Sequence, residues 1–262
     1  MCAAVIGAHV DQTDPIAAAR ERSADVAQFF LGDPQGWKQP VVAYAGGAEG
    51  LRADAAAAGI GLYVHAPYVI NVATSNNRIR IPSRKLLQQH VDGAAEIGAT
   101  AVIVHGGHVL KDDDPAVGID NWRKTIERLE LRCPVLIENT AGGDRAMARR
   151  LEAIARLWEV VGQFDVGFCL DTCHAHAGGI EVATAVDAVM AITGRIDLVH
   201  CNDSRDTFDS GADRHANIGV GQLDADDLTG LLKTAGAPIL VETPADGQAA
   251  DIAWIRDRLG HS

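Results

Sequence analysis

The sequence predicts an α/β fold, a (β/α)8 barrel of parallel strands with its active site at the C-terminal strand ends. The chain has 262 residues, and this barrel forms a single domain at about 250 residues. Short apolar runs alternate with longer helical segments along the chain. The runs are rich in Val, Ile and Leu on both alternating faces, as expected of parallel strands buried on both sides. These observations together favour a TIM barrel.

The apolar runs define eight candidate strands. In chain order they are Ala4–His9, Val26–Leu31, Gly61–His65, Ala101–His105, Val135–Glu138, Val166–Asp171, Leu198–His200 and Ile239–Glu242. An open doubly wound sheet is the alternative. No G-x-G-x-x-G motif follows the first run, which weakens a dinucleotide-binding version of that sheet.

Helical segments separate the predicted strands. The clearest are Ser83–Ile97, Trp122–Leu131, Asp144–Val161, Glu181–Ile192 and Ala225–Ala235. Ser83 at an N-cap position and Gly98 after the last turn frame the first of these helices. Since no low-complexity linker or charge block divides the chain, we expect one domain spanning residues 1–262.

Composition and charge exclude several classes of protein. Hydrophobic residues make up 47% of the chain, so disorder is excluded as its main state. The 23 basic and 35 acidic residues give a net charge of −12, which argues against a nucleic-acid binder that relies on charge alone. A binder whose carboxylates are neutralised by bound metal stays open.

The sequence also predicts where the protein works. No apolar run reaches the roughly 18 to 20 residues that span a bilayer. The first ten residues have neither a basic region nor a cleavage-site pattern, so secretion is not expected. The five Cys residues are irregularly spaced, which does not suggest a disulfide framework. We therefore expect a cytoplasmic protein.

Six of the eight predicted strands end in a residue that can bind a metal ion. They are His65, His105, Glu138, Asp171, His200 and Glu242. A single strand-end histidine is more often structural. In a barrel, however, the C-terminal strand ends converge on one face, and burying an unpaired charge there is costly. Six such endings therefore favour a shared metal pocket.

Two short clusters extend this set. Asp171 and His174 lie three apart where a strand turns into a helix, and Asp213 and His215 lie two apart in an extended loop. The total is five histidines and four carboxylates, too many for one zinc ion, which takes about four ligands. Two or three ions fit, and imidazole with carboxylate suits zinc, manganese or iron. Such multimetal sites typically stabilise the attacking and leaving oxygens of a phosphoryl displacement.

Three neighbouring residues have two interpretations each. Cys169 and Cys173 are soft ligands or small buried hydrophobes, and we favour the second because C-x-x-x-C is not a standard zinc spacing. His9 ends the first strand. It either supports a metal ligand or has a structural role, and the sequence favours neither interpretation.

The segments that carry these residues resemble bacterial endonuclease IV, the zinc-dependent apurinic/apyrimidinic endonuclease family (AP endonuclease family 2). The motifs I-E-N-T-A-G, L-D-T-C-H and H-x-N-D-S followed by D-R-H occur in this order. The matching stretches are Ile6–Val10, His65–Tyr68, Ile137–Gly142, Leu170–Ala175, His200–Asp203 and Asp213–His215. The resemblance extends from Ile6 to Glu242 and implies a TIM barrel with three zinc ions per chain, in part replaceable by Mn²⁺ or Fe²⁺.

The resemblance also implies how the ligands are shared among the ions. It places His65 and His105 on the first zinc, with Glu138 bridging to the second. It completes the second site with Asp171, His200 and Glu242, and forms the third from His174, Asp213 and His215. Glu138 would also be catalytic, orienting or deprotonating the attacking water.

The activity implied is hydrolysis of the phosphodiester 5′ to an abasic site in duplex DNA, leaving a 3′-hydroxyl, in base excision repair. The expected partner is abasic duplex DNA, with no membrane, for a monomer in the cytoplasm associated with the nucleoid. A metal-dependent sugar isomerase or epimerase on the same barrel is the alternative, although five histidines and the D-R-H cluster argue against it. A non-enzymatic DNA-damage binder with structural metal is a further one.

Several residues are candidates for DNA contact. Tyr68 looks like the aromatic residue that the family stacks against DNA near the lesion. Gln35 stands in the loop after the second strand where family members often carry a basic residue, so this contact departs from the family, although Lys38 is nearby. The basic candidates follow strands three and seven; they are Arg78, Arg80, Arg84, Lys85, Arg205 and Arg214.

Overall fold

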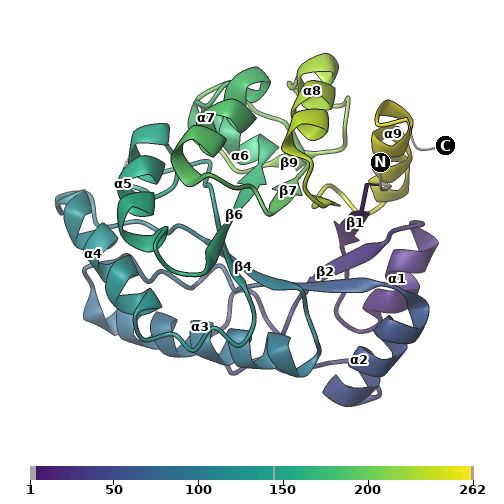
Figure 1. The fold of residues 1–262 in the computed structure, drawn as a ribbon, viewed down its shortest axis with the longest axis horizontal. Helices are drawn as coiled ribbons and strands as arrows, with labels where there is room; N and C mark the ends of the chain where they lie inside the picture. The colour runs from purple at the N-terminus through teal and green to yellow at the C-terminus, as the bar shows by residue number, and fades with distance from the viewer. Residues whose placement is uncertain (1–3, 144, 261–262) are drawn as a thin grey trace.

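A computed structural model describes residues 4–143 and 145–260. Its strands close into a barrel in the order β1-β10-β7-β6-β5-β4-β3-β2, and every neighbouring pair is parallel. Helices surround this barrel on the outside (Figure 1). The predicted (β/α)8 fold class is confirmed.

The barrel strands lie close to their predicted positions. They are β1 (Ile6–His9), β2 (Val26–Phe30), β3 (Gly61–His65), β4 (Ala101–His105), β5 (Val135–Glu138), β6 (Val166–Asp171), β7 (Leu198–His200) and β10 (Ile239–Val241). The five strands from β3 to β7 have the predicted bounds, and β1, β2 and β10 are one or two residues shorter. Two further short strands, β8 (Asp203–Ser204) and β9 (His215–Ala216), form an antiparallel hairpin beyond the end of β7.

Several helices begin directly after a residue whose side chain caps them. The helices are α1 (Pro15–Glu21), α2 (Gly47–Ala58), α3 (Asn77–Glu96), α4 (Pro115–Ile126), α5 (Leu151–Val161), α6 (Thr172–Gly178), η1, a 3-10 helix (Val182–Thr184), α7 (Ala185–Thr193), α8 (Ala225–Ala235) and α9 (Gln248–Arg258). The carboxylates of Asp14, Asp114 and Asp224 each accept a backbone N–H of the first turn that has no partner inside the helix.

Two helix starts were predicted too late. Helix α3 begins six residues before Ser83, because the side chain of Asn76 accepts the N–H of Arg78 and caps it there. The Ser83 side chain is buried and accepts the backbone N–H of Asn71 at 2.9 Å, so the predicted N-cap role is wrong. Helix α4 begins at Pro115, after the Asp114 cap, and ends at Ile126 rather than Leu131.

Two other helical segments are shorter than predicted. Helix α5 begins at Leu151, and Asp144, the predicted start, lies outside the described residues. The chain before α5 bonds to neighbouring loops instead: the N–H of Met147 donates to Gly107 and the N–H of Thr140 donates to Ala148. In the predicted segment Glu181–Ile192, the first turn is the 3-10 helix η1.

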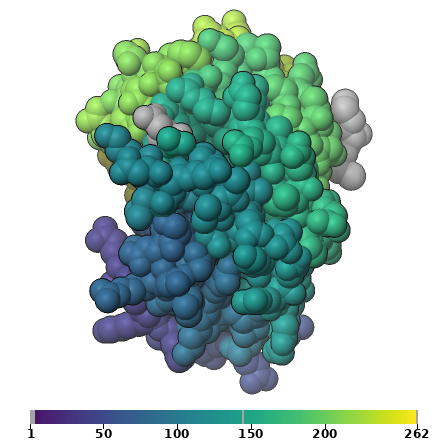
Figure 2. All heavy atoms as spheres, turned by 90° about the vertical axis from the view of Figure 1, so that its left-hand side faces the viewer, coloured from purple at the N-terminus to yellow at the C-terminus, as the bar shows by residue number. Residues whose placement is uncertain are grey.

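The core has an inner and an outer part. Inside the barrel lies an apolar layer from seven strands: Val26, Tyr63, Ala101, Ile103, Leu136, Cys169, Leu198 and Leu240. A larger apolar cluster fills the space between the strands and the helices. Figure 2 shows, in teal, the side of the molecule on which α4 and α5 pack against each other.

Within the described part of the chain, no single helix is long and apolar enough to cross a membrane. By length and composition, only the pair Thr172–Gly178 and Val182–Thr193, bent by 117°, passes that test together.

Candidate metal centre

A polar layer lies directly above the apolar layer inside the barrel. Side chains alternate along a strand, so the residue two positions after an interior residue also points inward. Six strands follow this rule and carry the predicted strand-end residues: His65, His105, Glu138, Asp171, His200 and Glu242. Strands β1 and β2 place His9 and Gln28 at the equivalent positions. The barrel therefore brings the predicted residues together on one face.

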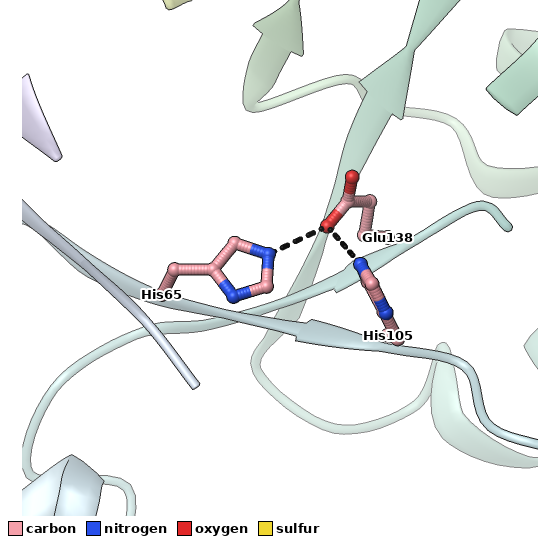
Figure 3. A group of neighbouring side chains, drawn as sticks. All are labelled: His65, His105 and Glu138. Carbon is pink, nitrogen blue, oxygen red and sulfur yellow. Dashed lines mark hydrogen bonds and ion pairs between the residues drawn. The ribbon is translucent and has the colours of Figure 1, made fainter. Parts of the chain in front are cut away.

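The first group of candidate ligands consists of His65, His105 and Glu138 (Figure 3). The Nε2 atoms of the two histidines lie 3.2 and 3.3 Å from the same oxygen of Glu138, Oε2. The Nδ1–H of His65 donates to the carbonyl oxygen of Ala66 at 2.7 Å. Since a carbonyl only accepts, this bond leaves Nε2 of a neutral His65 free to bind a metal ion.

The second group shares Glu138 with the first and adds Asp171, His200 and Glu242. Here Nδ1 of His200 faces the carboxylates, 3.1 Å from Glu138 Oε1 and 3.2 Å from Glu242 Oε2. Asp171 is fixed by the start of α6, because its Oδ1 accepts the backbone N–H of His174 at 2.6 Å. Its Oδ2 lies 4.0 Å from His200 Nδ1.

The third group consists of His174, Asp213 and His215. The Nε2 atoms of both histidines lie 3.1 and 3.2 Å from Asp213 Oδ1. Both atoms are buried, and neither has a hydrogen-bond partner within the described residues. Nδ1–H of His174 donates to the carbonyl of Asn139 at 3.0 Å, so Nε2 is the free atom of that ring.

These distances fit metal ions of the zinc type. Two ligands of a tetrahedral zinc ion, each about 2.0 to 2.1 Å from it, lie about 3.3 Å apart. The N···O separations of 3.1 to 3.3 Å in the three groups match that spacing. These three groups have the same members as the three sites that the resemblance implies, and a fourth possible group, Asp171, Cys173 and His215, has no counterpart among them. The donor set of imidazole and carboxylate suits Zn²⁺, Mn²⁺ or Fe²⁺.

The two cysteines near the site are buried thiols. Cys169 belongs to the apolar layer, and Cys173 lies within reach of Asp171 and His215. Burial raises the pKa of each thiol to about 12. The place of Cys169 in the apolar layer fits a small buried hydrophobe, whereas Cys173 lies beside candidate ligands.

Three buried amides support the candidate ligands, and the sequence analysis gave none of them a role. Asn202 donates to Asp171 Oδ2 at 2.6 Å and accepts the backbone N–H of Glu242 at 2.7 Å. Asn139 accepts the backbone N–H of Asp171 at 2.7 Å. Gln28 contacts both His200 and Glu242. Asn139 and Asn202 lie inside the I-E-N-T-A-G and H-x-N-D-S motifs, which is the signal that could have indicated them.

Close packing explains why the I-E-N-T-A-G motif ends in glycine. A Cβ atom at Gly142, the last residue of I-E-N-T-A-G, would lie 2.5 Å from the carbonyl oxygen of Gly211. Only glycine therefore lets the chain that leads to Asp213 approach the end of β5 this closely.

Burial and mutual charge shift the pKa values of these groups strongly. Burial alone would raise the pKa of Glu138, but the nearby histidines, His200 first, hold it well below its usual range. Burial alone would lower the pKa of His200, but Cys169, Glu242 and Glu138 raise it well above normal. The pKa of His215 rises to about 9, because Asp213 and Asp171 outweigh the opposite effect of burial. The pKa of His9 is lowered, mainly by burial, so this ring is neutral.

These shifts predict opposite pH dependences for metal-free and zinc-loaded protein. The raised pKa of His215 contributes stability below its ordinary value of 6.5, and this is lost as pH rises through about 9. The lowered pKa of Glu138 contributes stability above its ordinary value of 4.5, and this is lost at lower pH. We expect Tm of the metal-free protein to decrease as pH increases from about 6 to 9. Over the same range the increase in Tm caused by adding zinc should become larger, since zinc binds deprotonated histidine. Thermal unfolding across this range checks it, and a metal-free Tm that rises toward pH 9 would contradict it.

Tyr68 lies at the mouth of the site, and Gln35 lies in a loop that contacts Tyr68. Tyr68 is 54% exposed, and it lines a cavity of about 290 Å³ with His65, His105 and residues of the other groups. Its backbone N–H donates to the carbonyl of Pro34, which ties it to the loop that carries Gln35. The Gln35 side chain is exposed. Both positions allow contact with a bound substrate.

The basic candidates differ in how freely they could reach DNA. Arg78 and Lys85 are exposed, and no ion pair of theirs occurs among the described residues. Arg84 donates to Thr125 and to the carbonyl of Asn121, so it joins α3 to α4 instead.

The other three basic candidates are partly engaged within the chain. Arg80 donates to the carbonyl of Thr74 at 3.1 Å. Arg205 is exposed beside the third ligand group and donates to the carbonyl of His215 at 2.9 Å. Arg214 forms an ion pair with Asp206.

A parallel barrel with histidines and carboxylates gathered at its C-terminal strand ends defines a metal-dependent TIM-barrel enzyme. A family model described as "Xylose isomerase-like TIM barrel" matches residues 16–258. The chain belongs to the endonuclease IV family of AP endonucleases within this group. Probable endonuclease 4 of Mycobacterium bovis is 57% identical over 259 residues, which cover 98% of this chain and 99% of the relative.

Solved structures agree with this membership. The crystal structure of endonuclease IV from Thermus thermophilus superposes with a TM-score of 0.84 at 26% identity, over 98% of this chain and 99% of that one. A D-tagatose 3-epimerase-like protein superposes with a TM-score of 0.78 at 18% identity, over 97% of each chain, and this likeness shows the fold alone. The predicted family and the predicted class of enzyme are confirmed, and the sugar isomerase or epimerase alternative is supported by the shared fold only.

Proposed function

We propose that this enzyme hydrolyses the phosphodiester 5′ to abasic sites in duplex DNA, leaving a 3′-hydroxyl, in base excision repair. The observation that supports it most is the arrangement of three ligand groups around one cavity, with Glu138 shared by two of them. We assign the first group to one zinc ion, the second to another and the third to a third, with Mn²⁺ or Fe²⁺ able to replace part of the zinc.

When bound, the metal ions would lower the pKa of water and offset the negative charge that develops on the phosphate oxygens. The residues of the chain would do the remaining work. Glu138 is fully buried, and its lowered pKa keeps it a carboxylate that can hold metal ions and orient water. Tyr68 at the mouth of the cavity would stack against the DNA next to the lesion.

Selection of the abasic site would follow from the size and lining of the cavity. An abasic nucleotide has no base to unpair, so turning it out of the duplex costs little. The cavity of about 290 Å³ is lined by histidine rings, the Tyr68 ring and carboxylates, which suits a sugar with its phosphate. We propose that this domain, residues 1–262, acts as a monomer in the cytoplasm, close to the nucleoid.

A second cavity marks where we propose that the flanking DNA lies. It measures about 580 Å³ and lies between the loop after β2 and helix α3. Trp37, Lys38, Arg78 and Lys85 line it. The three cations have no carboxylate partner among the described residues, so they are free to neutralise phosphates.

Removing positive side chains from this cavity should weaken DNA binding without changing the rate of the chemical step. The double variant Arg78→Ala/Lys85→Ala is expected to bind abasic and intact duplex more weakly alike, and to lose about one unit of salt slope per lost phosphate contact. Binding titrations at several salt concentrations measure this slope. Arg123→Ala/Lys124→Ala is the control, because these cations on α4 already pair with Asp120, and no change is expected there. A fall in saturated turnover with an unchanged slope would place the DNA elsewhere.

Metal removal tests the proposed function as a whole. Chelation should abolish cutting of an abasic duplex, and zinc should restore it as the metal content approaches about three ions per chain. A sugar isomerase or epimerase would hold one or two ions and convert a ketose instead. Restored metal without restored cutting would contradict the proposal.

A further inference from the structure

Gln28 is the polar residue of an otherwise apolar strand, V-A-Q-F-F. It is fully buried, and it stands two positions after Val26 of the apolar layer, at the level of the candidate ligands. A buried side-chain amide is costly unless it is hydrogen-bonded. Its partners therefore show why the strand tolerates it.

Those partners fix which way the amide points. The Nε2 atom of Gln28 lies 2.5 Å from Glu242 Oε1 and 3.0 Å from His9 Nδ1. A carboxylate only accepts, so the amide nitrogen must face Glu242 and the amide oxygen must face the other way. That oxygen lies 2.9 Å from Nε2 of His200. The Nε2 atom of His200 therefore carries the proton and donates it to Gln28.

The chain of bonds explains an exception in the metal centre. Four of the five candidate histidines turn Nε2 toward a carboxylate, and His174 also has Nδ1 3.2 Å from Glu138 Oε1, whereas His200 faces the carboxylates through Nδ1 alone. A neutral imidazole has one protonated nitrogen, so the bond from Nε2–H to Gln28 leaves the lone pair on Nδ1. The same amide donates to Oε1 of Glu242, the carboxylate oxygen that does not face His200.

We infer that Gln28 is a positioning residue. It selects the Nδ1 lone pair of His200 and anchors Glu242, so that both turn a free atom toward the other members of the second ligand group. The inference builds on the metal role given to that group in the proposed function. Loss of a hydrogen bond that a neighbouring residue makes to a metal ligand typically lowers metal affinity by about 10- to 100-fold.

Two substitutions separate the two bonds. Gln28→Met keeps the length of the side chain and loses both bonds, whereas Gln28→Glu keeps an acceptor for His200 and loses the donor to Glu242. Gln248→Met is the matched control: Gln248 is also buried, but its amide donates to the backbone carbonyls of His9 and Thr243 and touches no candidate ligand.

Zinc competition titrations and the ¹H–¹⁵N signal of the His200 Nε2–H in zinc-loaded protein give the readouts. For Gln28→Met we expect one of three ions to bind about 10- to 100-fold more weakly, with loss of the protected Nε2–H signal. For Gln28→Glu we expect weaker binding of the same ion with the Nε2–H signal retained. Gln248→Met should keep three tight ions and the signal, whatever its Tm.

The inference is overturned if Gln28→Met binds all ions as tightly as wild type, or if its His200 signal is unchanged. It is also overturned if Gln248→Met loses the same ion, which would indicate a general effect of a buried amide on stability. A wild-type chain that binds zinc tightly and does not cut abasic DNA would contradict the proposed function and leave the role of Gln28 standing.

Discussion

Replacing Glu138 with Gln is expected to slow incision of abasic DNA by at least about 100-fold while the chain still folds, a loss typical of a missing general base. Both oxygens of Glu138 are used: Oε2 faces His65 and His105, and Oε1 faces His174 and His200. An amide has the same shape, but it lacks the negative charge and one of the two acceptors. Single-turnover cutting of a labelled abasic duplex measures the effect.

Asp197→Asn is the control for this experiment. The Asp197 carboxylate lies just before β7, at the opposite end of the barrel, and accepts the backbone N–H of Phe168 at 2.9 Å. Its loss should leave incision unchanged. Glu138→Gln protein that folds and cuts at close to the wild-type rate would show that Glu138 does not have the proposed role.

The second large effect is expected at the third ligand group. His174→Ala or His215→Ala should reduce bound zinc from about three to about two ions per chain and strongly slow incision, and the double variant should lose little more. The reason is that both Nε2 atoms face one oxygen of Asp213, although the two histidines come from α6 and β9. Metal analysis of dialysed protein gives the count.

His176→Ala is the matched control, because His176 lies in the same helix as His174 and its ring faces the carbonyl of Asp206 instead. It should keep about three ions. A double variant that loses two ions would mean that His174 and His215 serve separate sites.

The sequence predicts the barrel strands well because their signal is local. A short run of Val, Ile and Leu defines each strand. The His, Glu or Asp that ends the run marks the residue whose side chain points into the barrel. For this reason five strands have the predicted bounds, and the six strand-end candidates lie together. The order of the strands around the barrel follows from the same alternation of strand and helix.

The helix starts were harder to predict because distant residues compete for the caps. Ser83 is a good N-cap by type, yet its hydroxyl accepts the N–H of Asn71, and the helix begins at Asn77 after the Asn76 cap. Gln28 was missed for a related reason, since one amide in an apolar strand has no meaning until β7 and β10 bring His200 and Glu242 to it. Its register, two positions after Val26, was the available signal.

The candidate DNA contacts show a further limit of sequence. Arg78, Arg84 and Lys85 are close in sequence and equal in charge, but helix geometry turns Arg84 toward α4 and leaves the other two exposed. Charge alone could not separate them, because the partners of Arg84 lie about 40 residues further along the chain.

The most direct test of the central claim is the cutting of a duplex that carries one abasic site, with both product ends analysed. The zinc-loaded protein should cut only the strand with the lesion, on its 5′ side, and a polymerase should be able to extend the new 3′-hydroxyl. Glu138→Gln protein should give no such product in the same time. An intact duplex after incubation with zinc-loaded wild-type protein, or a cut on the 3′ side of the lesion, would contradict the account.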